Sequence, residues 1–151
     1  MWNSTLHDTI TALHTLWESA PDLAGVWVTD GPPVGNDGAS ELIAVGYDGN
    51  EDSAVLETSS EGFDGDSNRE AYTVYCCVSA MTGNDDQDAV RARAFELYGH
   101  CCDALALDRT LNDLVLLARP AEVRVRQSAT ENGRACTVMF GVAVQAYTKE
   151  S

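Results

Sequence analysis

The stretch Glu70-Ala71-Tyr72-Thr73-Val74-Tyr75-Cys76-Cys77-Val78-Ser79-Ala80-Met81 decides the fold that we expect for this chain. It is rich in aromatic and β-branched residues, and side chains alternate along it with a period of two, so it predicts one long strand over 70–81. One face would carry Tyr72, Val74, Cys76, Val78 and Ala80. The opposite face would carry Thr73, Tyr75, Cys77 and Ser79. The first face is apolar enough to be buried, and the second is only partly so.

The residues after this strand predict a helix and then a hairpin. Asp85, Asp86 and Asp88 are placed where a helix N-terminus favours negative charge, and the helix is expected to run to about Asp108. Its buried stripe would contain Val90, Ala94, Leu97, Cys101 and Leu105. Extended segments are expected at 114–118 and 121–127, with Pro120 separating them or marking a bulge. Asn132-Gly133 is typical of a type I′ hairpin turn, and 134–148 reads as the last strand.

The residues before the long strand predict smaller elements. An amphipathic helix is expected over 4–19, with Ser4 as its N-cap. Strands are expected at 25–29, at 41–47 and around 54–57. Residues 58–69 are rich in Ser, Gly, Asp and Glu and predict a long acidic loop.

This order of elements predicts a single domain over residues 1–151 with an α+β fold. The sheet would be mainly antiparallel or mixed, and two helices would pack on one of its faces. The long acidic loop of about 58–69 would be its only low-complexity part.

The sheet face away from the helices is the first candidate functional surface. It would combine Tyr75 and Cys77 with Met139 and Tyr147, a mixture of polar and apolar side chains that is common in protein interfaces. Arg124 and Arg126 alternate with valines and would share one exposed strand face. We therefore assign these six residues to a subunit interface. An ordinary sheet face that the acidic loop partly covers is the alternative, and the sequence leaves both open.

The distribution of charge excludes several functions. Residues 1–68 contain 13 acids and no Lys or Arg, whereas residues 69–151 contain 11 acids and 9 bases, and the two parts give the net charge of −15. Proteins that bind nucleic acid or an anionic membrane need clustered basic residues. The acidic half would instead repel nucleic acid or attract basic partners, and no apolar run is long enough to span a membrane.

The sequence contains no recognisable catalytic, cofactor-binding or metal-binding set, so we expect no enzymatic activity. The five cysteines have neither zinc-ligand spacing nor the pattern of a disulfide framework, which favours buried, reduced thiols. His100 and Cys101 are adjacent on the predicted helix and would point in different directions. The acidic stretch 48–53 starts like a calcium loop but lacks the required glycine and final glutamate.

Several strings, taken in order, resemble the tail terminator (tail completion) proteins of long-tailed bacteriophages, especially siphophages of actinobacterial hosts. They are Trp27–Pro32, Ile43–Asp48, Arg69-Glu70, Ser79–Gly83, Ala89–Ala94, Arg126-Gln127 and the Asn132-Gly133 turn. The resemblance covers nearly the whole chain. One departure is Asn112-Asp113, which stands where such proteins often have glycines after the leucine at the Leu111 position.

The resemblance implies a non-enzymatic structural protein of the virion, located at the head-proximal end of the tail and in the host cytoplasm during assembly. Such proteins form a ring, usually a homo-hexamer, that ends polymerisation of the tail tube and joins the tail to the head–tail connector. Their partners are further copies of themselves, the tail tube protein and the connector, and DNA passes through the ring without specific binding. On this basis Asp64 and Asp66 are expected to face the channel or a subunit seam.

Two other functions remain compatible with the sequence. One is another phage neck or head-closure protein. The other, from a different class, is a small acidic cytosolic adaptor that binds a basic partner.

Overall fold

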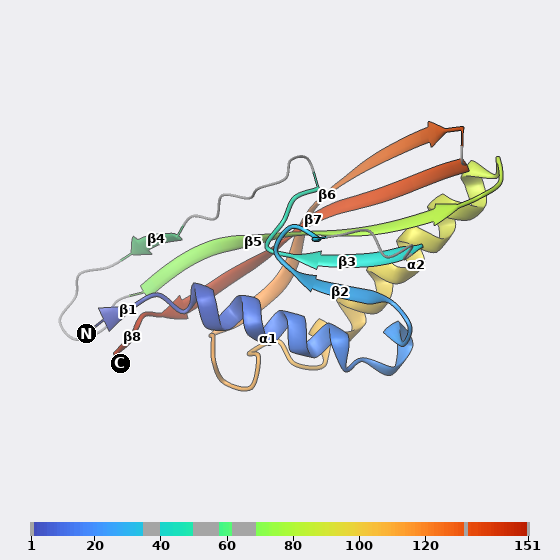
Figure 1. The fold of residues 1–151 in the computed structure, drawn as a ribbon. Helices are drawn as coiled ribbons and strands as arrows, with labels where there is room; N and C mark the ends of the chain where they lie inside the picture. Colours follow the sequence, from blue (N-terminus) through green and yellow to red (C-terminus); the bar gives the residue numbers. More distant parts are fainter. Residues whose placement is uncertain (1, 35–39, 50–57, 62–68, 132, 151) are drawn as a thin grey trace.

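The computed structural model describes residues 2–34, 40–49, 58–61, 69–131 and 133–150 (Figure 1). In chain order, the elements are β1 (Trp2–Asn3), α1 (Leu6–Glu18), a 3₁₀ turn η1 (Pro21–Leu23), β2 (Trp27–Asp30), β3 (Glu41–Val45), β4 (Thr58–Glu61), β5 (Arg69–Thr82), α2 (Gln87–Ala106), β6 (Leu117–Thr130), β7 (Gly133–Tyr147) and β8 (Lys149–Glu150).

Six of the strands form one mixed sheet, in the order β2-β3-β5-β7-β6, with β4 paired to the first residues of β5. The β2–β3 pair is parallel and the other pairs are antiparallel. Strands β5 and β7 pair from Arg69↔Tyr147 to Thr82↔Arg134, so the long strand predicted over 70–81 lies at the centre of the sheet. The predicted α+β fold is confirmed.

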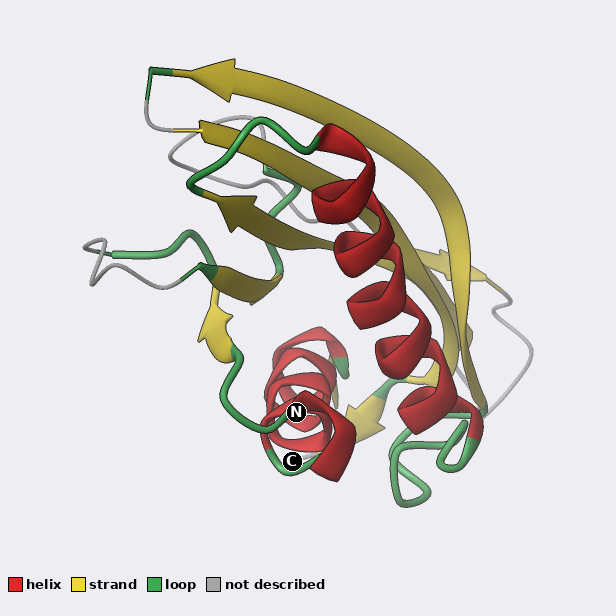
Figure 2. Cartoon of the chain, turned by 90° about the vertical axis from the view of Figure 1, so that its right-hand side faces the viewer, coloured by secondary structure: helices red, strands yellow, loops and turns green. Residues whose placement is uncertain are grey.

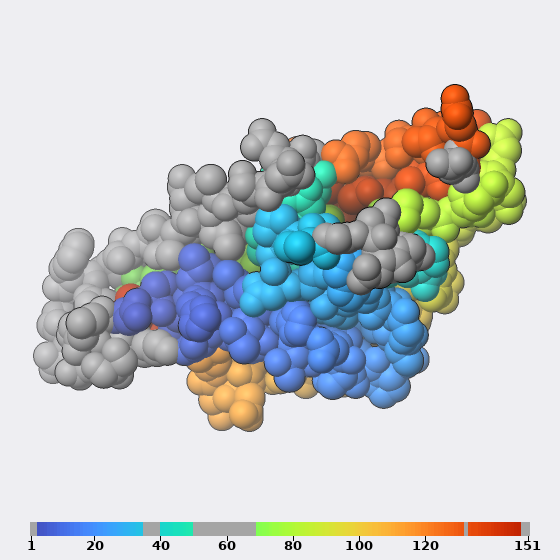
Figure 3. Space-filling model, viewed as in Figure 1, coloured from blue at the N-terminus to red at the C-terminus, as the bar shows by residue number. Residues whose placement is uncertain are grey.

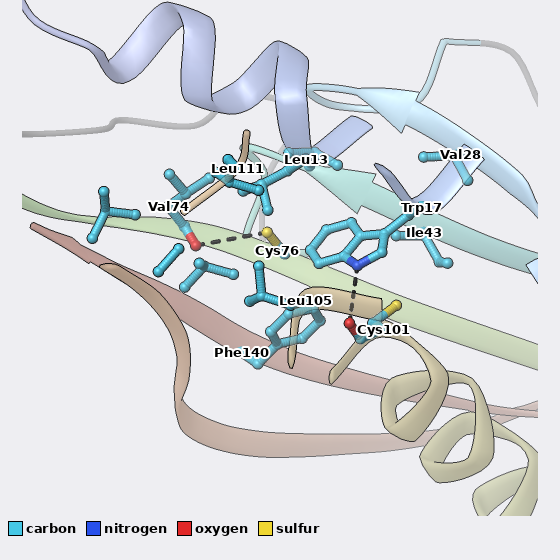
Figure 4. Close-up of a cluster of buried hydrophobic side chains, with 14 of the residues drawn as sticks. Leu13, Trp17, Val28, Ile43, Val74, Cys76, Cys101, Leu105, Leu111 and Phe140 are labelled. Atoms are coloured by element: carbon cyan, nitrogen blue, oxygen red, sulfur yellow. Dashed lines mark hydrogen bonds between the residues drawn. The ribbon is translucent and has the colours of Figure 1, made fainter. Parts of the chain in front are cut away.

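Both helices lie on the same face of the curved sheet (Figure 2). The core between them and the strands includes Trp17 of α1, Leu105 of α2 and Val74 of β5, all with fully buried side chains (Figure 4). The indole of Trp17 donates a hydrogen bond to the carbonyl oxygen of Cys101, at 3.1 Å, and its ring meets the edge of Phe140. Through these two contacts, Trp17 joins both helices to the sheet.

Helix α2 follows its predicted pattern closely. All five residues of the expected stripe, Val90, Ala94, Leu97, Cys101 and Leu105, are buried. Asp86 caps the N-terminus, because its carboxylate accepts a hydrogen bond from the Ala89 amide at 3.0 Å. On the flank toward β3, the Arg93 guanidinium forms a two-pronged ion pair with Glu41, which lowers the pKa of that carboxyl.

Helix α1 begins differently from the prediction. Ser4 was expected to be the N-cap, but Thr5 occupies that position and its side chain does not cap the helix. Instead, the buried carboxylate of Glu70 in β5 accepts hydrogen bonds from the Thr5 amide at 2.7 Å and the Thr5 hydroxyl at 2.6 Å. The Tyr72 hydroxyl lies 2.6 Å from the Thr9 hydroxyl. The Ser4 hydroxyl accepts from the Leu6 amide at 3.0 Å, so a local side chain and a carboxylate from a distant strand each satisfy one amide at the start of the helix.

Three other expectations need correction. The two segments expected around Pro120 are one strand, β6, with its bulge at Glu122 (φ 53°) rather than at the proline. Part of the expected loop 58–69 is strand, since Thr58–Glu61 forms β4 and Arg69 begins β5. The ends of the chain pair as β1 and β8, which was not predicted. The expected strand at 54–57 and the turn residue Asn132 lie outside the described residues.

A left-handed turn precedes β6. Leu111, Asn112 and Asp113 have φ angles of 49°, 60° and 65°. The Asn112 amide donates to the Asp108 carboxylate at 2.9 Å, and the Asp113 amide donates to the Thr110 hydroxyl at 3.2 Å. Asn and Asp tolerate this conformation best after glycine, so the turn keeps a backbone that glycine usually supplies.

Candidate subunit interface

The sheet face away from the helices is partly closed by the chain itself. Cys77 and Met139 are buried, at 2% and 7% exposure, and form a small cluster with Ala44 against which Tyr47 packs. A side chain on Gly49 would lie 3.6 Å from both Cys77 and Met139, so this glycine also covers them. Cys77 and Met139, predicted as interface residues, therefore belong to a second, small core of the protomer.

The two predicted arginines lie beside this small core. The Arg126 guanidinium donates a hydrogen bond to the Gly49 carbonyl oxygen at 2.7 Å, so it holds the covering turn of its own chain. Arg124 pairs in register with Met139 and, with Tyr75 and Asp48, lines a cavity of about 10 Å³. A cavity of that size holds at most one water.

Tyr147 lies apart from the other predicted interface residues. Its side chain is 47% exposed, it pairs in register with Arg69, and the guanidinium of Arg69 stands 5.8 Å from the ring centroid. Tyr147 lies eight positions along β7 from Met139, about 26 Å at the usual rise of a strand. The six predicted residues consequently do not form one patch.

A different surface, which we call the β6 stripe, emerges beside α2. It consists of Val123 and Val125 of β6 and Phe95 of α2, with exposed fractions of 46%, 41% and 39%. Val123 and Val125 pair with Phe140 and Val138, so they lie on the helix-covered face but beyond the helix. The alternation of valine and arginine in β6 was visible in the sequence, but the partial exposure of Phe95 was not.

Two contacts fix the register of α2 against β6 and place the three stripe residues together. The Arg91 guanidinium donates to the Gln127 side chain at 2.8 Å. Seven residues further along α2, Tyr98 packs edge-on against Phe140, the partner of Val123. Phe95 lies between these two contacts on the same flank of the helix, so it is level with Val125.

The thiols are unsuited to nucleophilic chemistry. Cys76, Cys77, Cys101 and Cys136 are buried, and Cys102 is half-buried. Burial raises the pKa of every one of them above the usual range, that of Cys77 to about 12. A buried, protonated thiol is a poor nucleophile.

The other sequence-based candidates are placed as follows. Asp64 and Asp66, expected to face a channel or seam, lie outside the described residues. Within the described part of the chain, no group of three or more His, Cys, Asp or Glu side chains is arranged to hold a metal ion. Among the same residues, no helix is long and apolar enough to cross a membrane.

Comparisons with known proteins give little further guidance. No protein-family model matches the chain, and no curated protein does. A solved chain from the virion of a native gene transfer agent particle is similar in structure over 91% of this chain and 94% of its own length. The sequence identity is 12% and the TM-score is 0.47. Values this low do not establish a shared function, so function has to be argued from this chain's own residues.

Proposed function

We propose that this protein is a structural component of a phage virion, a tail terminator that forms a ring at the head-proximal end of the tail tube. The ring ends polymerisation of the tube and presents a surface to the head–tail connector, and DNA passes through it. The role requires no catalysis, cofactor or metal.

The observation that carries this proposal is that the strings resembling tail terminators contact one another in the fold. The first two strings pair as β2 and β3 from Trp27↔Leu42 to Asp30↔Val45, and the Gly31 amide donates to the Val45 carbonyl oxygen at 2.6 Å. The strings of α2 and β6 are joined by the Arg91–Gln127 hydrogen bond. The resembling strings therefore lie in elements that contact one another.

The departure from the family pattern is also accounted for by the structure. Residues 111–113 adopt left-handed backbone conformations, which are the conformations that favour glycine. Asn112 and Asp113 stand where the resemblance leads one to expect glycines. The turn therefore supports the resemblance at Asn112-Asp113, where the sequence departs from the family pattern.

The acidic half suits a passage for DNA. With 13 acids and no Lys or Arg in residues 1–68, a wall built from this half would repel phosphate and let DNA slide. We place Asp64 and Asp66 at such a wall or at a subunit seam. Replacing both with Lys is expected to slow DNA ejection and leave tail assembly intact. Ejection at the normal rate would rule out a place on the channel wall.

The proposal is tested by imaging the purified protein with tail tubes of its phage in negative stain. A cap at one end of each tube is expected, together with tubes of uncontrolled length when the protein is left out. A failure to associate with tubes would overturn the proposed function.

A second candidate from the same assembly is a head-closure or neck protein, and the same preparation distinguishes it. A terminator is found on isolated tails before they join heads, whereas a head-closure protein is found on filled heads. An acidic cytosolic adaptor would be found on neither. Its basic partner would be recovered by affinity purification from infected cells.

A further inference from the structure

The outer half of β6 is an open sheet edge. From Val123 to Thr130 every residue is exposed, and among the described residues the strand pairs only with β7. In Figure 3 this hairpin projects at the end of the molecule away from the chain termini. The bulge of β6 and its proline lie before this stretch, so neither interrupts its edge. A long exposed edge of this kind is a template for pairing with another strand.

An apolar surface lies beside this edge. The β6 stripe of Phe95, Val123 and Val125 flanks the open edge, with three large apolar side chains each more than a third exposed. Apolar side chains next to an exposed strand edge are expected where another protein docks, because the docked partner buries both.

Charge indicates which partner fits. Three arginines and one glutamate give β6 a net charge of +2, so the remainder of this chain carries −17. The described acids of the first half include Glu18 and Asp22, with side chains 64% and 76% exposed. The strand is thus a basic element on a strongly acidic protein, and it is complementary to the first half of another copy.

Pairing of β6 with β6 of another copy is an isologous contact that closes at a dimer, so it cannot by itself build a ring. In an antiparallel pair centred on Val125, Arg124 of each copy would stand opposite Arg126 of the other. Like charges directly opposite each other destabilise a sheet. Repeated contacts between two different surfaces generate a ring when the rotation closes.

We propose that the β6 edge and the β6 stripe of one copy dock on the acidic first half of the next copy, and that this contact is the seam of the ring. The closure of the ring rests on the proposed function, whereas the contact between two copies does not. The partner is a second copy of this chain, and the contact combines apolar burial with attraction between β6 and acids such as Glu18 and Asp22.

The contact is tested by placing a benzophenone photo-crosslinker at position 123 and irradiating the protein alone and bound to tail tubes. The first Lys or Arg of the chain is Arg69, so trypsin releases residues 1–69 as a single peptide. A two-chain product joined to that peptide is expected. A product joined to β6 of the second copy, a product with the tube protein alone, or no product would overturn the seam.

Two matched variants, each made with the crosslinker in place, test the chemistry. Val125→Glu puts a carboxylate into the seam and is expected to lower the yield of the two-chain product at least tenfold. Leu107→Glu also replaces an exposed apolar side chain with a carboxylate, but at the C-terminal end of α2, 16 residues beyond Arg91. Leu107 is 91% exposed, and this variant is expected to leave the yield unchanged. Equal yields from the two variants would contradict a docked stripe. Thermal unfolding of both variants checks that the fold is intact.

The outcome is separable from that of the proposed function. If tubes are capped but position 123 crosslinks only to the tube protein, the seam is wrong and the terminator role stands. If two-chain products form but no tube is capped, the seam stands and the terminator role is wrong. Raising the salt from about 0.05 to 0.5 M is expected to weaken the contact, because exposed charges are then screened.

Discussion

The two faces of the central sheet differ in how they are closed. The face beneath the helices has a continuous core of large buried side chains, including Trp17, Leu97 and Phe140. The opposite face has a cluster of three buried residues, covered by Tyr47 and Gly49 of one turn. Two helices supply a broad apolar cover, whereas one turn closes only what lies directly beneath it. Among the described residues, the edge of β6 away from β7 pairs with no other strand.

Trp17→Ala is the change expected to have the largest effect, because it removes the side chain that joins both helices to the sheet. It opens a cavity and leaves the Cys101 carbonyl without its indole donor. A loss of about 3–5 kcal/mol in the free energy of unfolding is expected. Urea denaturation measures it, and a loss below about 1 kcal/mol, as at surface sites, would mean that the helices are not held through this residue.

Glu70→Ala tests the polar end of the same face. The substitution leaves the Thr5 amide and hydroxyl buried without their acceptor. An expected loss of about 2–3 kcal/mol combines those unsatisfied donors with the lost helix cap. Hydrogen exchange should show faster exchange in the first turn of α1, with α2 unchanged as the internal control. Unchanged exchange at Thr5 would contradict the role given to Glu70.

Met139→Ala tests the second face. Since the cluster is small and a single turn covers it, the site is able to collapse, and a loss of about 2 kcal/mol, the low end for such a change, is expected. Denaturation of this variant and of Trp17→Ala in parallel gives the comparison directly. A loss equal to that of Trp17→Ala would show that the second face contributes as much to the stability of the fold as the first.

Glu41→Gln is expected to have the smallest effect and tests the flank of α2. The pKa of Glu41 is lowered from 4.5 by its hydrogen bond and charge contact with Arg93. The ion pair therefore stabilises the fold above the unfolded pKa, and this stabilisation is lost as the pH falls through the folded pKa. At neutral pH, and allowing for solvent screening of the partly exposed Arg93, a loss of about 0.5–1 kcal/mol is expected.

The pH dependence supplies the control for this last variant. At pH 3, the difference in unfolding free energy between Glu41→Gln and the unchanged protein should be smaller than at pH 7, since Glu41 is then increasingly protonated. A difference that stays constant between the two pH values would mean that packing, and not charge, holds this flank.

Local pattern was enough to predict the centre of the molecule. The alternation of β5 and the stripe of α2 are periodic, and the core selects the apolar side of each. At the beginning of α1, Ser4 was predicted to bond the helix and does so at the Leu6 amide, but Thr5 is the N-cap and its amide bonds Glu70, 65 positions away, where no local rule reaches. Strand β4 was missed because its sequence, Thr-Ser-Ser-Glu, has no apolar alternation and its pairing with β5 defines it.

The candidate interface was predicted only in part. Arg124 lies on an exposed strand as expected, but Arg126 holds Gly49 of its own chain, and the cover over Cys77 and Met139 comes from a turn that the sequence shows only as acidic. The β6 stripe depends on the register between α2 and β6, which is set by the Arg91–Gln127 and Tyr98–Phe140 contacts. Such pairings join residues remote in sequence, and periodicity carries no information about them.

The sequence by itself determined the fold class, the stripe of α2, the long strand over 70–81 and the division of charge at Arg69. Each of these follows from the side chains of neighbouring residues and from their spacing. Only the tertiary structure decided which sheet face is closed, where the helix cap comes from and which edge stays open. Those properties depend on which distant segments meet, because burial and hydrogen-bond satisfaction are settled by the whole packed chain.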